Sequence, residues 1–230
     1  MQTKATEIPA VSVGSDSVSL GCSLQAQWRF KVALSTVLPV LFWTGYLLAQ
    51  RYPLGVVRPA PSLAVDAWIP FLPAAVYLYE SLWLLQSVAP WLMRDRHELW
   101  IYCRGLLMIL AVALSIFIVW PTASPRPECT ESVNALYRAL IQVDLDLNAF
   151  PSLHVAFALY SALGCRLVFA GLRFRPGLMV LIWVWTAGIL VATVLTKQHT
   201  VLDVAAGALL GWVGYALYLR NIPMREGSVP

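Results

Sequence analysis

Charged residues are few in this sequence. Only 12% of its 230 residues are charged, whereas 59% are hydrophobic and the mean hydropathy is +0.69. A soluble domain carries about twice that charged fraction, so the composition excludes an ordinary water-soluble protein. Apolar runs close to the length of a bilayer span recur along the chain, and lipid cannot satisfy unpaired backbone groups. We therefore expect an all-α, polytopic membrane protein.

Cysteine and histidine are also scarce. The four cysteines (Cys22, Cys103, Cys129 and Cys165) show no paired spacing and no CxxC motif, so no disulfide is predicted. They form no cluster with histidine at metal-ligand spacing, so we expect no metal site. The chain has only three histidines, which makes the position of each one informative.

Six apolar runs predict a bundle of six transmembrane helices. Their approximate ranges are 30–50, 70–93, 99–120, 151–170, 177–195 and 201–219. The first 28 residues are polar and rich in serine and threonine, which is typical of a disordered tail rather than a signal peptide. We therefore divide the chain into a disordered cytoplasmic tail (1–28), a six-helix membrane domain (29–221) and a short cytoplasmic tail (222–230).

The loops define two sides of the membrane. Six spans place both termini on one side and the loops 121–150 and 196–200 on the other. The terminal side carries ten basic residues: Lys4, Arg29, Lys31, Arg94, Arg96, Arg166, Arg173, Arg175, Arg220 and Arg225. The opposite side carries five: Arg51, Arg58, Arg126, Arg138 and Lys197. The positive-inside rule then predicts cytoplasmic termini in a plasma or inner membrane, with the two loops facing the periplasm, exterior or a lumen. The net charge of +4 follows from this excess and does not indicate nucleic-acid binding.

Two short motifs on the predicted outer side contain histidine. In the first, residues 197–203 (Lys-Gln-His-Thr-Val-Leu-Asp), His199 and Asp203 are four residues apart and share one helix face. A carboxylate that accepts a hydrogen bond from one ring nitrogen makes the other a better base or nucleophile. The alternative is a polar pair that only caps the helix.

The second motif is Phe-Pro-Ser-Leu-His at residues 150–154. His154 falls in the first turn of a predicted span, where Ser152 and the amides of a helix start form a natural anion site. A single histidine at a helix start is often a capping or packing residue. Two histidines brought to the same membrane face favour catalysis instead.

Two cations accompany the motifs. Arg126 lies at the head of the loop that leads to His154, and Lys197 precedes His199 by two residues. Arginine binds phosphate oxygens in a fork, and lysine supplies a point charge. The alternative for each is an interfacial cation with no ligand.

Both motifs resemble signatures of the type 2 phosphatidic acid phosphatase superfamily. Residues 148–154 resemble its Pro-Ser-x-His element, and residues 196–207 resemble its His-x-x-x-Asp element followed by small residues. The resemblance implies a six-helix bundle in which His199 is the nucleophile, Asp203 orients it and His154 is the acid and base. It implies that Arg126, Ser152 and Lys197 bind phosphoryl oxygens, and that no cofactor or metal takes part.

Two positions depart from the family pattern. Ala192 and Thr193 stand where the third signature has Ser-Arg, and Val119 stands where the first signature has lysine. Arg58, in the first outer loop, is a reserve candidate for the missing cation. These departures leave the substrate open.

The expected function is an integral membrane phosphoesterase that hydrolyses a lipid phosphate or polyprenyl diphosphate through a phosphohistidine. An alternative is a lipid phosphotransferase of the inositol phosphorylceramide synthase type, which replaces water with a lipid hydroxyl. A non-enzymatic alternative is a proton-coupled transporter or channel, for which Glu80 and Arg104 are the intramembrane charges of interest. The expected partners are a phosphorylated lipid and the bilayer, and the sequence leaves the oligomeric state open.

Overall fold

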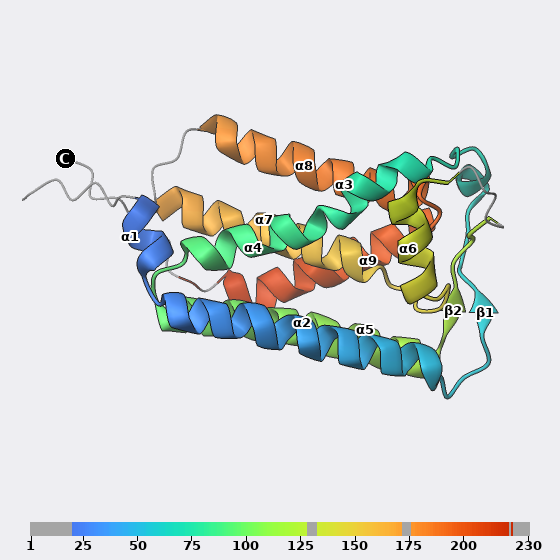
Figure 1. The fold of residues 1–230 in the computed structure, drawn as a ribbon, viewed down its shortest axis with the longest axis horizontal. Helices are drawn as coiled ribbons and strands as arrows, with labels where there is room; N and C mark the ends of the chain where they lie inside the picture. The colour runs from blue at the N-terminus through green and yellow to red at the C-terminus, as the bar shows by residue number, and fades with distance from the viewer. Residues whose placement is uncertain (1–19, 128–132, 172–175, 221, 223–230) are drawn as a thin grey trace, which may run out of the picture.

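The computed structural model describes residues 20–127, 133–171, 176–220 and 222. Helices dominate this part of the chain, and the long ones lie side by side along one axis (Figure 1). The helices are α1 (Leu20–Gln25), α2 (Trp28–Arg51), α3 (Val76–Glu80), α4 (Leu82–Leu92), α5 (Arg96–Val119), α6 (Ala135–Val143), α7 (Leu153–Gly171), α8 (Pro176–Leu195) and α9 (Val201–Gly214). A π-helical turn (Tyr215–Leu219) extends α9, and 3-10 turns cover Ala64–Ala67 and Pro73–Ala75.

Five helices in the described residues are long and apolar enough to cross a membrane. They are Trp28–Arg51, Arg96–Val119, Leu153–Ala170, Gly177–Leu195 and Val201–Leu219. They coincide with five of the six predicted spans to within a few residues. The prediction of a mostly helical protein with several apolar helices of membrane-spanning length is therefore confirmed, whereas the count of six spans is not.

The predicted second span, 70–93, is interrupted. Pro73 begins a 3-10 turn, and Ser81 then separates α3 from α4. The Ser81 hydroxyl donates a hydrogen bond of 2.6 Å to the carbonyl of Leu78, three residues earlier, and accepts one of 2.8 Å from the indole of Trp185. Such a side-chain bond competes with the helical ladder and bends a helix. Neither half is as long as the five helices above.

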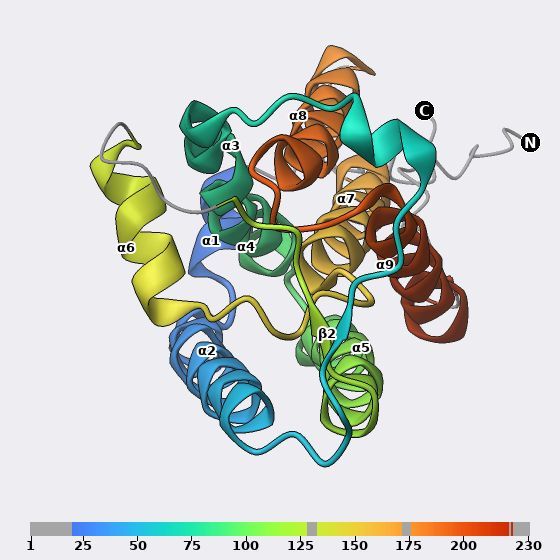
Figure 2. The same ribbon diagram turned by 90° about the vertical axis from the view of Figure 1, so that its right-hand side faces the viewer.

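One end of the bundle carries additional structure that the all-α prediction missed. The loop between α5 and α7 contains α6 and a two-residue strand, β2 (Thr122–Ala123). This strand pairs in parallel with β1 (Arg58–Pro59) from the loop after α2. Figure 2 views this end, with β1 and β2 crossing the front and α6 beside α2. The elements therefore cover the end of the bundle at which α7 and α9 begin.

Helix α7 lies at the centre of the bundle, and 67% of its span is buried. It packs closely on α9, where a Cβ added at Gly207 or Gly211 would collide with the carbonyl oxygens of Ser152 and Ala156. Close approach of two helix backbones through small residues is typical of membrane bundles. This contact sets the distance between the starts of α7 and α9, which carry the two motifs.

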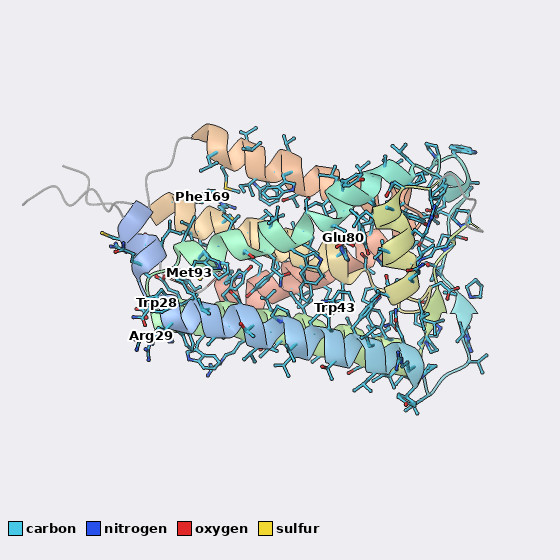
Figure 3. The ribbon with its side chains drawn as sticks, in the orientation of Figure 1. Trp28, Arg29, Trp43, Glu80, Met93 and Phe169 are labelled. Atoms are coloured by element: carbon cyan, nitrogen blue, oxygen red, sulfur yellow. The ribbon has the colours of Figure 1, made fainter. Side chains whose placement is uncertain are left out.

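The opposite end of the bundle carries α1. Residues 1–19 of the predicted disordered tail lie outside the described residues, and α1 forms near the end of that tail. The Lys31 ammonium, 2% exposed, donates to the carbonyls of Ser23 (2.7 Å) and Trp91 (2.6 Å), which joins α1, α2 and α4. Figure 3 shows Trp28, Arg29 and Met93 toward this end, and Trp43 and Glu80 in the half nearer α6.

Candidate active site

His154 lies in the first turn of α7. The Ser152 hydroxyl accepts a hydrogen bond of 3.3 Å from the amide of Val155 and so caps this helix. The imidazole of His154 stacks on Tyr79, with 3.7 Å between ring centroids and 13° between planes, and Trp83 meets it edge-on at 6.3 Å. Its Nε2 atom is buried and has no hydrogen-bond partner among the described residues. The ring is therefore held by aromatic contacts while one nitrogen stays available.

His199 lies in the short turn between α8 and α9. Its Nδ1 atom is 2.9 Å from the carbonyl oxygen of Ala149, and the side chain is 8% exposed. A carbonyl oxygen only accepts, so this contact requires a proton on Nδ1, and in a neutral ring the lone pair is then on Nε2. The contact fixes the tautomer that a nucleophilic histidine needs.

Asp203 is buried beside His199 and caps α9. Its Oδ2 atom accepts a hydrogen bond of 2.8 Å from the amide of Thr200, and the Thr200 hydroxyl accepts one of 3.3 Å from the amide of Asp203. Oδ2 is 3.8 Å from Nδ1 of His199, which is beyond hydrogen-bond distance. The ring is thus oriented by Ala149, and Asp203 contributes a nearby negative charge rather than the expected hydrogen bond.

The two histidines line one cavity of about 30 Å³. The remaining lining comes from α2, α3, α4, α6 and the segment before α7: Phe42, Trp43, Tyr46, Tyr79, Glu80, Trp83, Leu140, Asp144, Asn148 and Leu153. Residues 45 positions apart in the chain therefore meet at one end of the bundle, as the two-motif prediction required.

Arg126 does not line the cavity, but it contacts Asp144 of the lining and Gln198 in the turn that carries His199. Its guanidinium donates to the side chain of Asp144 (3.0 Å), to the Asp144 carbonyl (2.5 Å) and to the side-chain oxygen of Gln198. Its Nε atom and the Nε2 atom of Gln198 are buried donors without an acceptor in the described part of the chain. His154 Nε2 and the acceptor oxygens Asn148 Oδ1 and Asp203 Oδ1 also lack a partner among the described residues, and such atoms need one.

Asp144 is the acid that the sequence reasoning missed. Besides Arg126, it accepts hydrogen bonds from the hydroxyl of Tyr46 (2.8 Å) and the amide of Gln50 (2.6 Å). Its carboxylate is 7% exposed. A signal was present, because Tyr46 and Gln50 are four residues apart at the outer end of the first span and share a helix face. The residues next to Asp144 in the sequence, however, do not indicate that its side chain contacts this helix face.

The other predicted phosphate ligands, like Arg126, are not among the residues that line the cavity. Lys197 donates to the carbonyls of Asp66 (3.0 Å) and Ile69 (2.6 Å) in the loop before α3, and it does not line the cavity. Ser152 is fully buried between α7 and α9, with its amide bonded to the carbonyl of Asp203 (3.1 Å). Both residues join elements of the site to one another.

The remaining charges of interest are dispersed. Glu80 lines the cavity and accepts a hydrogen bond of 3.0 Å from the indole of Trp83. Arg58 is exposed on β1, and Arg104 is exposed on α5. Within the described residues, no three His, Cys, Asp or Glu side chains gather as a metal-binding group. The structure therefore brings Glu80, and not Arg58, to the two histidines.

Comparison with known proteins gives one match. A family model described as the PAP2 superfamily matches residues 99–226, more than half of the chain. The matched range contains both histidine motifs and Arg126. Neither the curated proteins nor the solved structures compared with the chain give a match.

Proposed function

We propose, from the premise that the chain belongs to the PAP2 superfamily, that it is a membrane phosphoesterase that hydrolyses a phosphorylated lipid through a phosphohistidine. One observation carries the proposal. His154 and His199 line a single cavity, and the contact between His199 and Ala149 places the lone pair of a neutral His199 ring on Nε2. A family of phosphatases implies a phosphorylated substrate, and the apolar helices favour a lipid.

The first step forms the phosphohistidine. The lone pair of His199 Nε2 attacks phosphorus as the bond from phosphorus to the alcohol oxygen breaks. Protonated His154 donates its proton to the departing oxygen, and the lipid alcohol leaves. The charge of Asp203, 3.8 Å from Nδ1, stabilises the cationic ring that results.

The second step returns the enzyme to its starting state. His154, now neutral, takes a proton from water while the water oxygen attacks phosphorus. The bond from nitrogen to phosphorus breaks, its electron pair returns to His199 Nε2, and inorganic phosphate leaves. A lipid hydroxyl in place of water would give the transferase, with the same residues in the same roles.

Arg126 is the proposed ligand of the phosphoryl oxygens. Its buried Nε donor has no acceptor among the described residues, so a substrate oxygen can accept from it. Asp144 and Gln198 hold the other guanidinium nitrogens. In this proposal Ser152 and Lys197 position the motif segments through their backbone contacts, and phosphoryl binding falls mainly on Arg126.

The proposed membrane arrangement has six spans. We take α3 and α4 together as the second span, bent at Ser81, because only that residue separates them and they run from one end of the bundle toward the other (Figure 1). The excess of basic residues at the α1 end then favours cytoplasmic termini. The two histidines face the opposite compartment.

Trapping with radiolabelled substrate tests the mechanism. Purified protein is mixed with phosphatidic acid labelled on phosphorus, quenched in alkali and analysed for protein-bound label, with and without a metal chelator. We expect wild-type protein to carry label and release phosphate in both conditions, and His199→Ala to do neither. His97→Ala is the matched control, because His97 lies exposed at the start of α5.

The outcomes separate the alternatives. Hydrolysis by folded His199→Ala would show that another group is the nucleophile. Label that moves from phosphatidic acid to an added ceramide, instead of to phosphate, would assign the transferase reaction. Loss of activity in the chelator would overturn the metal-independent mechanism.

A further inference from the structure

A second, larger cavity adjoins the candidate active site. Its volume is about 230 Å³, and it lies between α2, α4, α5 and α7. Phe42 and Trp83 line both this cavity and the smaller one at the two histidines. The two spaces therefore lie next to each other, with the side chains of Phe42 and Trp83 as their common wall.

The larger cavity is long and mostly apolar. Its lining on α2 runs from Lys31 to Phe42, and its lining on α5 runs from Leu99 to Leu110. Each pair lies about 17 Å apart along its helix at 1.5 Å per residue. Leucine and aromatic side chains dominate between these limits, as at Leu34, Leu38, Leu106, Leu107 and Phe157.

Lys31 closes the far end of this cavity. Its ammonium donates to the carbonyls of Ser23 and Trp91, which lie in the C-terminal turns of α1 and α4. The negative end of a helix dipole stabilises a cation there. Because these carbonyls hold the ammonium, the end of the cavity presents no charge free to bind an anionic headgroup.

We infer that this cavity holds a hydrocarbon chain of the lipid whose phosphoryl group reacts at His199, an inference that rests on the function proposed above. Lipid tails are as apolar as leucine, so moving a chain from the bilayer into the cavity adds little hydrophobic free energy. Binding of the chain instead orients the substrate, because a lipid whose chain is held in the cavity keeps its phosphorus close to the nucleophile. The closed end at Lys31 limits the chain length that fits.

Cys103 provides a test that does not depend on turnover. Its side chain lines the cavity and is 2% exposed, and it lies about 10 Å along α5 from Leu110, at the active-site end. The protein, with Cys22, Cys129 and Cys165 replaced by serine or alanine, is reconstituted in phosphatidylcholine vesicles. The rate of Cys103 modification by N-ethylmaleimide is measured with butylphosphonate and with dodecylphosphonate, neither of which can be hydrolysed.

The longer chain should reach Cys103, and the shorter should not. We expect dodecylphosphonate to slow modification by about tenfold or more at saturation, and butylphosphonate to leave the rate unchanged. Equal rates with and without dodecylphosphonate overturn the proposal. Equal protection by both compounds also overturns it.

A matched pair of α2 variants tests the same site by activity. Leu38 lines the cavity, whereas Leu41 is 49% exposed on another face of the helix. We expect Leu38→Trp to lower the ratio of kcat/KM for dodecyl phosphate to that for butyl phosphate about tenfold, and Leu41→Trp to retain the wild-type ratio. If Leu38→Trp and Leu41→Trp have the same ratio of kcat/KM for the two phosphates, the proposal is overturned.

The two proposals fail separately. Protection of Cys103 by dodecylphosphonate without hydrolysis of phosphatidic acid or of either alkyl phosphate would leave the chain site standing and remove the catalytic proposal. Hydrolysis of both phosphates with no protection and no change in the Leu38→Trp ratio would do the reverse.

Discussion

Individual residues in the active site have roles that depend on the backbone around them. His199 is oriented by a carbonyl oxygen, that of Ala149, while Asp203 is engaged in capping α9. Every residue carries a backbone carbonyl, so the sequence cannot show which carbonyl accepts a hydrogen bond from His199. A sequence motif therefore identifies the Asp203 carboxylate but not the Ala149 carbonyl. Asp144 is the converse case, a side chain whose place in the site depends on partners from other segments, among them Arg126 at 3.0 Å.

Asp144→Asn tests whether this acid positions Arg126. The pair is nearly buried, at 12% and 7% side-chain exposure, and removing one partner of a buried ion pair leaves an uncompensated charge. We expect kcat/KM for phosphatidic acid to fall by about tenfold or more, which corresponds to about 1.4 kcal/mol of transition-state stabilisation. Steady-state kinetics of the purified variant measure the loss.

The control for this prediction lies two residues along the loop. Asp146→Asn, at an exposed side chain, should change kcat/KM little. In a double-mutant cycle, Asp144→Asn should add almost nothing once Arg126 is replaced by alanine. Fully additive losses would mean that Asp144 acts independently of Arg126.

Helices contribute to the site through how closely they pack and where they bend. The bend at Ser81 separates α3 from α4, and α3 carries Tyr79, whose ring stacks on His154. The close approach of α7 and α9 depends on Gly207 and Gly211, where no Cβ fits without moving backbone. The distance between the two histidines is therefore set by helix packing.

Gly211→Ala tests this contact. A Cβ at this position would lie 2.5 Å from the carbonyl oxygen of Ala156, so α9 must move away from α7. Overpacking of this kind costs about 1–3 kcal/mol. We expect a lower midpoint in thermal or denaturant unfolding in detergent, together with reduced activity.

The comparison variant is Gly177→Ala in α8. A Cβ there meets nothing within 4 Å, so its addition should leave both stability and activity close to wild type. If the two glycine variants unfold at the same midpoint, the α7–α9 contact is not as tight as proposed.

The whole molecule has two different ends. One end carries α6 and the two short strands, and the other carries α1 (Figures 1 and 3). Both histidines line a cavity with residues of α6 at the first end, and the buried Lys31 donates to Ser23 of α1 at the second. Between the ends lie five helices of membrane-spanning length and the bent pair α3 and α4. This polarity is what an enzyme acting from one face of a bilayer requires.

Cysteine labelling tests the orientation of this molecule in the membrane. In a background without native cysteines, Trp28→Cys and Leu54→Cys place thiols at opposite ends of α2, where the native side chains are 55% and 82% exposed. Because basic residues favour the cytoplasmic side, we expect a membrane-impermeant maleimide added to intact cells to label position 54 only. Labelling of position 28 alone would invert the proposed topology, and labelling of both would rule out a single orientation.

The sequence alone determined the membrane class, five of the helices and the two histidine motifs. Hydrophobic length predicts a span because the bilayer core has one thickness, and small residues after His199 suit close helix packing. These features depend on residues that are close together in the sequence, so they can be predicted without the tertiary structure.

Only the tertiary structure decided the contacts that complete the site. The Ala149 carbonyl on His199, the Asp144–Arg126 pair, the stacking of Tyr79 on His154 and the attachment of Lys197 to a distant loop all join residues far apart in sequence. The apolar cavity between α2, α4, α5 and α7 is of the same kind, since each helix supplies only one wall of it. Residue periodicity reports which face of a helix is apolar, whereas the partner that covers this face is chosen by packing in three dimensions.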